Sequence, residues 1–168
     1  LAACVVLVLL SVLRPLDAGD GVSIRQQDGK LRVEIGGNLF TEYHFRDTPR
    51  PFCHPVLGPG GVPMTRDWPM KESPGEEKDH PHHRSLWFAH GKVNGLDFWS
   101  DGKEAGKIVH QKFLAVKSGK TSGLIRSENL WVSYAGITVC SDERTLRFHA
   151  GDNPRIMDFE FILKACRS

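Results

Sequence analysis

Apolar and polar residues alternate along several short stretches of the chain, which is typical of half-buried β-strands. The alternation is clearest at 31–35, where Leu and Val face one side and Arg and Glu the other. It returns at 155–165, where five apolar residues share one face: Met157, Phe159, Phe161, Leu163 and Ala165. Further strand candidates lie at 39–45, 85–89, 107–116, 123–133 and 137–148.

Turns rich in Gly, Asn, Asp and Pro separate these candidates, for example at 36–38, 117–120 and 150–154. No stretch of the sequence keeps a 3.6-residue apolar period over three turns. Many short strands divided by turns predict an all-β fold, an antiparallel β-sandwich or barrel. A strand as apolar as 155–165 needs neighbours. We therefore expect either that this strand pairs with an earlier strand of the chain or that the natural protein continues beyond residue 168.

Residues 48–81 interrupt the strand pattern. They carry eight of the ten prolines, and proline cannot donate a ladder hydrogen bond. Apolar residues such as Val56 and Met64 favour burial, which argues against disorder. We predict a long, ordered Pro/Gly-rich loop over 48–81 that lies across one end of the sheets, close to a pocket.

The first thirteen residues carry no charge and are mostly apolar. A membrane-spanning helix needs about 20 such residues, and Arg14 and Pro15 end the run, ahead of a Leu-Asp-Ala sequence that resembles a signal-peptidase site. We predict that 1–18 is an N-terminally truncated signal peptide. The alternative is a buried strand or helix. The β-sandwich domain at 19–168 would then be exported to the periplasm or the extracellular space.

Composition adds limits on partners. The 22 basic and 20 acidic residues give a net charge of +2, so no basic surface for nucleic acid is predicted. The region 19–168 contains no apolar run of membrane-spanning length. Cys53, Cys140 and Cys166 allow one disulfide in an oxidising compartment, and the sequence does not choose the pair.

A cluster of histidines is the richest chemical feature: His80, His82 and His83 lie within four residues. Three interpretations remain open. The imidazoles form ordinary hydrogen bonds on a polar loop, or the three bind a divalent transition metal. In the third, they line a polar pocket for an uncharged or anionic ligand, a sugar or another polar small molecule, where imidazole donates hydrogen bonds or transfers protons near neutral pH. This third interpretation needs no cofactor.

Several motifs resemble an uncharacterised bacterial family often labelled "PmoA family protein" or "methane oxygenase PmoA". They lie at 50–52, 54–61, 65–70, 79–88, 93–99 and 142–146. The resemblance extends from about Gly29 to Ala165 and implies that the chain is the N-terminal half of a longer domain. Methane oxidation is set aside, because a membrane-bound oxygenase subunit needs several spanning helices and 19–168 contains no run for one.

The chain also resembles, more weakly, the galactose-mutarotase-like β-supersandwich, which binds sugars in a groove on one sheet. That resemblance implies an antiparallel supersandwich, incomplete here at its C-terminal end. His83 and His90 are similar in order to the histidine pair of those enzymes. Their catalytic glutamate has no counterpart in this sequence.

These observations predict an exported carbohydrate-binding or carbohydrate-processing protein. If it is an enzyme, we expect sugar-directed acid/base chemistry of epimerase, lyase or hydrolase type. His83 would transfer the proton, His54 or His90 would assist, and Asp79 would orient an imidazole. The expected binding residues carry charged, imidazole or indole groups and are Arg84, Arg66, Asp67, Trp87, Trp68, Trp99 and His82. For Arg66 and Asp67, a salt bridge that holds the loop is the alternative. A His-ligated metalloprotein and a non-catalytic surface interaction module remain alternatives for the whole protein.

Overall fold

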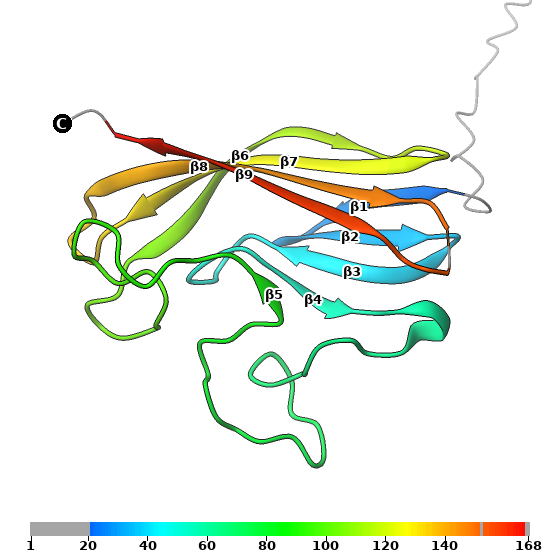
Figure 1. Cartoon of the computed structure of the whole chain (residues 1–168), viewed down its shortest axis with the longest axis horizontal. Helices are drawn as coiled ribbons and strands as arrows, with labels where there is room; N and C mark the ends of the chain where they lie inside the picture. The colour runs from blue at the N-terminus through cyan, green and yellow to red at the C-terminus, as the bar shows by residue number, and fades with distance from the viewer. Residues whose placement is uncertain (1–20, 152, 167–168) are drawn as a thin grey trace, which may run out of the picture.

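The computed structural model describes residues 21–151 and 153–166, and it contains two antiparallel sheets that face each other (Figure 1). The first sheet has the order β1 (Val22–Gln27), β2 (Lys30–Ile35), β3 (Asn38–His44), β4 (Phe52–Val56) and β5 (Leu86–Trp87). The second has the order β6 (Lys107–Lys117), β7 (Ser122–Val132), β8 (Thr138–His149) and β9 (Met157–Ala165). The predicted all-β antiparallel sandwich is confirmed. The expected signal peptide at 1–18 lies outside the described residues.

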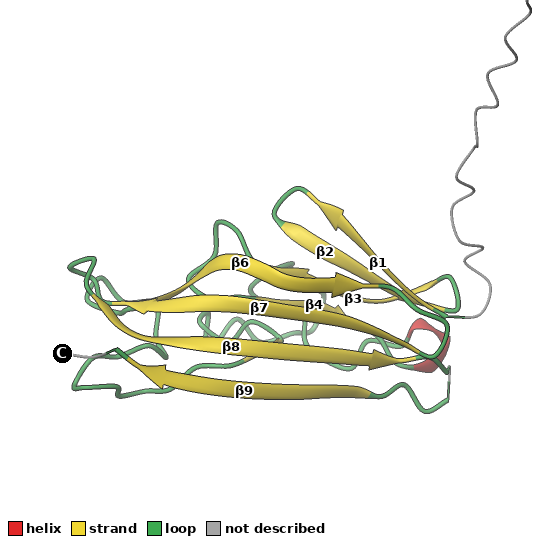
Figure 2. Cartoon of the chain, turned by 90° about the horizontal axis from the view of Figure 1, so that it is seen from above, coloured by secondary structure: helices red, strands yellow, loops and turns green. Residues whose placement is uncertain are grey.

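Both sheets are meanders, since every neighbouring pair of strands is also consecutive in the chain. Gly36 and Gly37 join β2 to β3 with φ angles of 57° and 75°, which glycine adopts without steric cost. Figure 2 shows the second sheet as an ordered row from β6 to β9. The described residues include one short 3-10 turn, η1 (Pro59–Gly61), and no helix among them is long and apolar enough to cross a membrane.

An apolar core fills the space between the sheets. Its buried members from the first sheet include Leu31, Val33 and Tyr43, and those from the second include Leu146 and Phe148. A smaller cluster lies at one end of the sandwich and consists of Phe98, Ile108, Trp131 and Cys140. Because Phe98 belongs to the link between β5 and β6, this cluster fixes that link against the second sheet.

Strand β4 corrects the expectation of an unbroken loop over 48–81, and β1 was not predicted either. β4 lies between β3 and β5 even though it contains Pro55. Thr41 pairs with Val56 and Tyr43 with Cys53, so the extra residue on β4 forms a bulge at His54 and Pro55. A bulge leaves an amide out of the ladder, and a proline is tolerated there.

Strand β9 pairs with β8 along its whole length, from Phe148 opposite Met157 to Cys140 opposite Ala165. Its expected apolar face is half-buried at Phe159 and Phe161, but Leu163 is 55% exposed. All three thiols in the described residues, Cys53, Cys140 and Cys166, are free. Burial raises the pKa of the Cys53 thiol to about 12.

A buried ion pair lies inside the sandwich on β8. The Asp142 carboxylate accepts hydrogen bonds from Arg144 Nε (2.8 Å) and Nη2 (3.0 Å). It also accepts from Asn129 Nδ2 (2.8 Å) and Trp131 Nε1 (2.7 Å). Arg144 Nη1 donates across the sandwich to the carbonyl oxygen of Pro51, beside β4 (3.3 Å). The pair therefore links the two sheets.

We predict that Asp142→Asn lowers the free energy of unfolding by about 3–5 kcal/mol, because Arg144 then remains buried without a counter-charge. Guanidinium denaturation followed by tryptophan fluorescence measures the loss. The control is Arg46→Ala, which breaks an ion pair with Asp28 in which both side chains are exposed to solvent. This control should cost less than about 1 kcal/mol. Equal losses in the two variants would contradict the role given to the buried pair.

Candidate functional site

An open pocket of about 380 Å³ lies beside β5. Six residues line it: Thr65, Arg66, His83, Ser85, Trp87 and Trp99. The structure thus brings together four of the residues that the sequence singled out, Arg66, His83, Trp87 and Trp99. Thr65 and Ser85 were missed, because short hydroxyl residues carry no distinctive spacing. Their hydroxyl oxygens lie 2.8 Å apart and share a hydrogen bond.

The strand pairing of β5 aims Trp87 at the pocket. Leu86 lies opposite Cys53 and packs against the main core. Successive side chains of a strand point to opposite faces, so Trp87 emerges on the outer face of the first sheet. Its ring lies 4.8 Å from the guanidinium of Arg50, which is fully buried. Trp87 is therefore held in place by a cation–π contact with Arg50.

A tight turn presents the second indole, that of Trp99. The Asp97 carboxylate accepts hydrogen bonds from the Trp99 amide (2.7 Å) and from Ser100 Oγ (2.5 Å). The hydrogen bond from Ser100 is the main reason that the pKa of Asp97 is lowered. The ring centroids of Trp87 and Trp99 are 4.8 Å apart, with an interplanar angle of 46°. The two indoles form an angled aromatic wall.

The imidazole of His83 faces this wall. Its centroid lies 5.4 Å from Trp99 and 6.0 Å from Trp87. The ring centroids of His82 and His80 lie 4.4 Å and 4.9 Å from that of His83. Burial lowers the pKa of His83, and electrostatic interactions with His82 and His80 lower it further. The neutral ring is thereby favoured, so His83 can accept a hydrogen bond or a proton near neutral pH.

Arg66 both lines the pocket and holds its loop. Its guanidinium donates to Asp79 Oδ1 (2.5 Å) and to the backbone oxygens of Asp79 (2.9 Å) and His80 (3.0 Å). The bond from Arg66 is the largest cause of the lowered pKa of Asp79. The other Asp79 oxygen contacts His80 Nδ1 at 2.5 Å. The imidazole that Asp79 orients is therefore that of His80.

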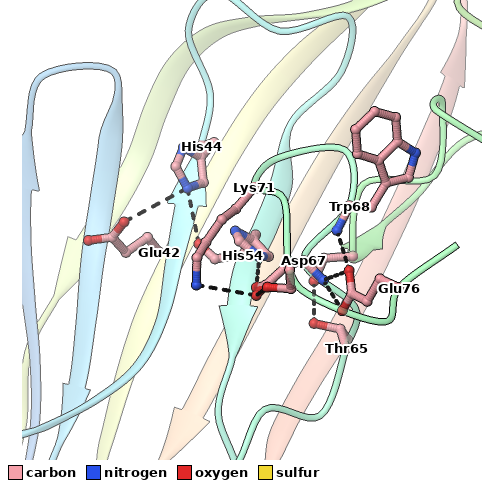
Figure 3. Close-up of polar contacts among 10 residues, drawn as sticks. Glu42, His44, His54, Thr65, Asp67, Trp68, Lys71 and Glu76 are labelled. Atoms are coloured by element: carbon pink, nitrogen blue, oxygen red, sulfur yellow. Dashed lines mark hydrogen bonds and ion pairs between the residues drawn. The ribbon is translucent and has the colours of Figure 1, made fainter. Parts of the chain in front are cut away.

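A second polar cluster fastens the loop to the sheet (Figure 3). His54 on β4 is only 9% exposed, and its Nε2 lies 3.1 Å from Asp67 Oδ1. Ser73 Oγ donates to the same carboxylate (2.5 Å), and this bond is the main reason that the pKa of Asp67 is lowered. Glu76 accepts from the backbone amides of Asp67 (2.9 and 3.0 Å) and Trp68 (2.8 Å). The contact between His54 and Asp67 thus joins the loop to strand β4.

The remaining predicted residues lie around the pocket rather than in it. Trp68 donates from Nε1 to the carbonyl oxygen of Asp79 (3.0 Å). Arg84 donates to Asp101 (3.2 Å), and His90 is exposed and accepts a hydrogen bond from the Lys92 amide (3.3 Å). His82 lies at the rim, where its ring centroid is 6.3 Å from that of Trp99.

Of the three clustered histidines, His80 and His83 stack, and His82 meets both of their rings edge-on. The rings of His80 and His83 are nearly parallel, with an interplanar angle of 17°. Within 21–151 and 153–166, no group of three or more His, Cys, Asp or Glu side chains is placed so that it could hold a metal ion. The arrangement resembles an imidazole surface facing a pocket more than a coordination sphere.

A comparison with protein families matches residues 30–168 to the "Family of unknown function (DUF6807)", and the chain belongs to this family. No curated protein and no solved structure matches the chain. The expected membership of the PmoA-labelled family is therefore wrong, because the matching family is DUF6807. The weaker mutarotase-like resemblance receives no support from these comparisons.

We predict that His83 titrates below the ordinary histidine pKa of about 6.5, for the reasons of burial and neighbouring charge given above. Histidine ring signals followed by NMR across pH 4–9 measure it. His82→Ala should raise the pKa of His83, because it removes the electrostatic interaction with His82 and opens the His83 ring to water. His90→Ala, which changes an exposed residue, should leave it unaltered. A His83 pKa above 6.5 would contradict the neutral imidazole.

Proposed function

We propose that this member of DUF6807 binds a carbohydrate in the pocket formed by Trp87, Trp99 and His83. The observation that carries the proposal is the angled pair of indoles, one of which, Trp99, is 41% exposed. An exposed tryptophan in a pocket offers a large apolar face with a polar edge. A sugar ring has matching C–H faces and a rim of hydroxyl groups.

The polar groups of the pocket fit hydroxyl groups. Thr65 and Ser85 can each donate and accept, and a neutral His83 ring offers one donor and one acceptor. Arg66 is already paired with Asp79, so its charge is balanced within the site. The pocket therefore favours an uncharged or weakly charged sugar over a strongly anionic one.

His83 is the group we propose for any chemical step. Its lowered pKa makes it a proton acceptor near neutral pH, as a general base requires. It would take a proton from a bound hydroxyl or from a carbon next to a carbonyl, and return it to another position. The hydroxyl pair of Thr65 and Ser85 would orient the sugar beside it.

We also propose that the protein acts outside the cytoplasm. The uncharged apolar run at 1–13, with the Leu-Asp-Ala sequence at 16–18 that resembles a signal-peptidase site, supports an export signal.

Trp99→Ala should weaken carbohydrate binding by about tenfold or more, since about 1.4 kcal/mol of lost stacking changes an affinity tenfold. A broad panel of neutral mono- and oligosaccharides, screened first on an array and then by calorimetry, identifies the sugar and measures the loss. Trp99→Phe should recover most of the affinity because it keeps a flat ring. The control Val62→Ala changes a side chain that is 58% exposed and outside the pocket. A panel without any bound sugar would refute the proposal.

His83→Gln should abolish turnover of a bound sugar, at least about a hundredfold, while its affinity changes little. Glutamine keeps hydrogen-bonding groups near the same place but cannot transfer a proton at neutral pH. Product formation by NMR and affinity by calorimetry separate the two effects. Full turnover in the variant would remove His83 from the chemistry and leave binding as the function of the pocket.

A further inference from the structure

A second open pocket, of about 670 Å³, lies next to the first. Its lining comes from the link between β5 and β6, including Asp97, Ser100 and Lys103, and from Tyr134 on the turn between β7 and β8. Figure 1 shows that link and that turn at the same end of the sandwich. Tyr134 is 62% exposed. Such an exposed aromatic ring in a pocket is available to a ligand.

One turn forms the wall between the two pockets. Trp99 lines the first, whereas Asp97 and Ser100, its neighbours along the chain, line the second. The Asp97 carboxylate holds both Trp99 and Ser100 by hydrogen bonds. The exposed rings of Trp99 and Tyr134 therefore belong to two pockets whose linings meet in the turn at 97–100.

The chemistry of the second pocket resembles that of the first. It combines an aromatic ring with a rim of polar groups, here Lys103, Glu104 and the loop backbone. A β-carbon built on Gly102 would meet only Ser100 Oγ, at 3.7 Å, so the space beside Gly102 is open. Both pockets are open to solvent rather than closed around a cavity. Open, adjacent pockets suit a chain that passes over them better than a single enclosed sugar.

We propose that the Tyr134 pocket is a second subsite of the carbohydrate site, and that the ligand is an oligosaccharide of several units. This inference rests on the proposed function. One unit would stack at Trp99 and a later unit of the same chain at Tyr134. Because the two units are covalently joined, the second contact forms at high effective concentration and raises the affinity for longer chains.

Calorimetry with oligosaccharides of increasing length tests the inference. The probes are cello-, xylo-, chito- and galacto-oligosaccharides of one to six units, used with the whole protein. For a series that binds, affinity should rise with length. Tyr134→Ala should weaken binding of the longest members about tenfold and leave the mono- and disaccharide unchanged. Trp99→Ala should weaken binding at every length.

Two further variants sharpen the test. Gly102→Leu should act like Tyr134→Ala, because its side chain occupies open space in the second pocket without strain in the backbone. Ile137→Ala removes an apolar side chain that is 67% exposed on the same turn as Tyr134 but does not line the pocket. This control should match the wild type at every length. Unaltered thermal unfolding of each variant confirms that it folds.

The outcomes separate the two proposals. If Trp99→Ala weakens binding while Tyr134→Ala and Gly102→Leu match the wild type at every length, the second subsite is refuted and the first pocket stands. The second subsite is refuted in the same way if affinity does not rise with length. If the wild type binds no member of any series and no sugar of the broader panel, the proposed function fails, and the subsite fails with it.

Discussion

The buried pair of Asp142 and Arg144 is the constraint on which the rest of the structure depends. A guanidinium between two sheets must keep its counter-charge and its hydrogen bonds, because water cannot replace them there. Arg144 meets this need with Asp142 on its own strand and with the Pro51 carbonyl oxygen of the other sheet. Its guanidinium also lies within 6.0 Å of the rings of Phe88 and Phe161. The spacing of the sheets is therefore set by polar geometry as well as by apolar packing.

The contact of Arg144 with Pro51 is linked to the first pocket through the peptide bond between Arg50 and Pro51. Pro51 follows Arg50, which is buried, donates to Asp101 and lies under the ring of Trp87. Arg50 also donates to the carbonyl oxygen of Ser100, in the turn that presents Trp99 (2.7 Å). Two buried arginines thus connect the interior of the sandwich with both indoles. The site is positioned by the core, although most of its residues lie on loops.

The sequence patterns predicted the structural features that depend on residues close together in the chain. The alternation at 155–165 predicted β9, because a strand with one covered face shows its period directly. Strand β4 was not predicted from the sequence, because its proline lies at a bulge that is visible only in the pairing with β3. Nearness along the chain placed His83 beside Trp87. It could not show that Asp67 binds His54, that Arg50 supports Trp87, or that Tyr134 joins the link from β5, since folding alone brings those residues together.

The turn at Asp97 divides the surface between two separate parts of the chain. The residues that face the first pocket belong to 65–99, whereas Tyr134 belongs to a hairpin of the second sheet. The hairpin contributes no lining residue to the first pocket, and Thr65 and Ser85 contribute none to the second. Natural selection can thus alter the lining of one pocket without altering the lining of the other. A change at Asp97 affects both pockets at once, because its carboxylate holds Trp99 of the first and Ser100 of the second, so evolution has little freedom there.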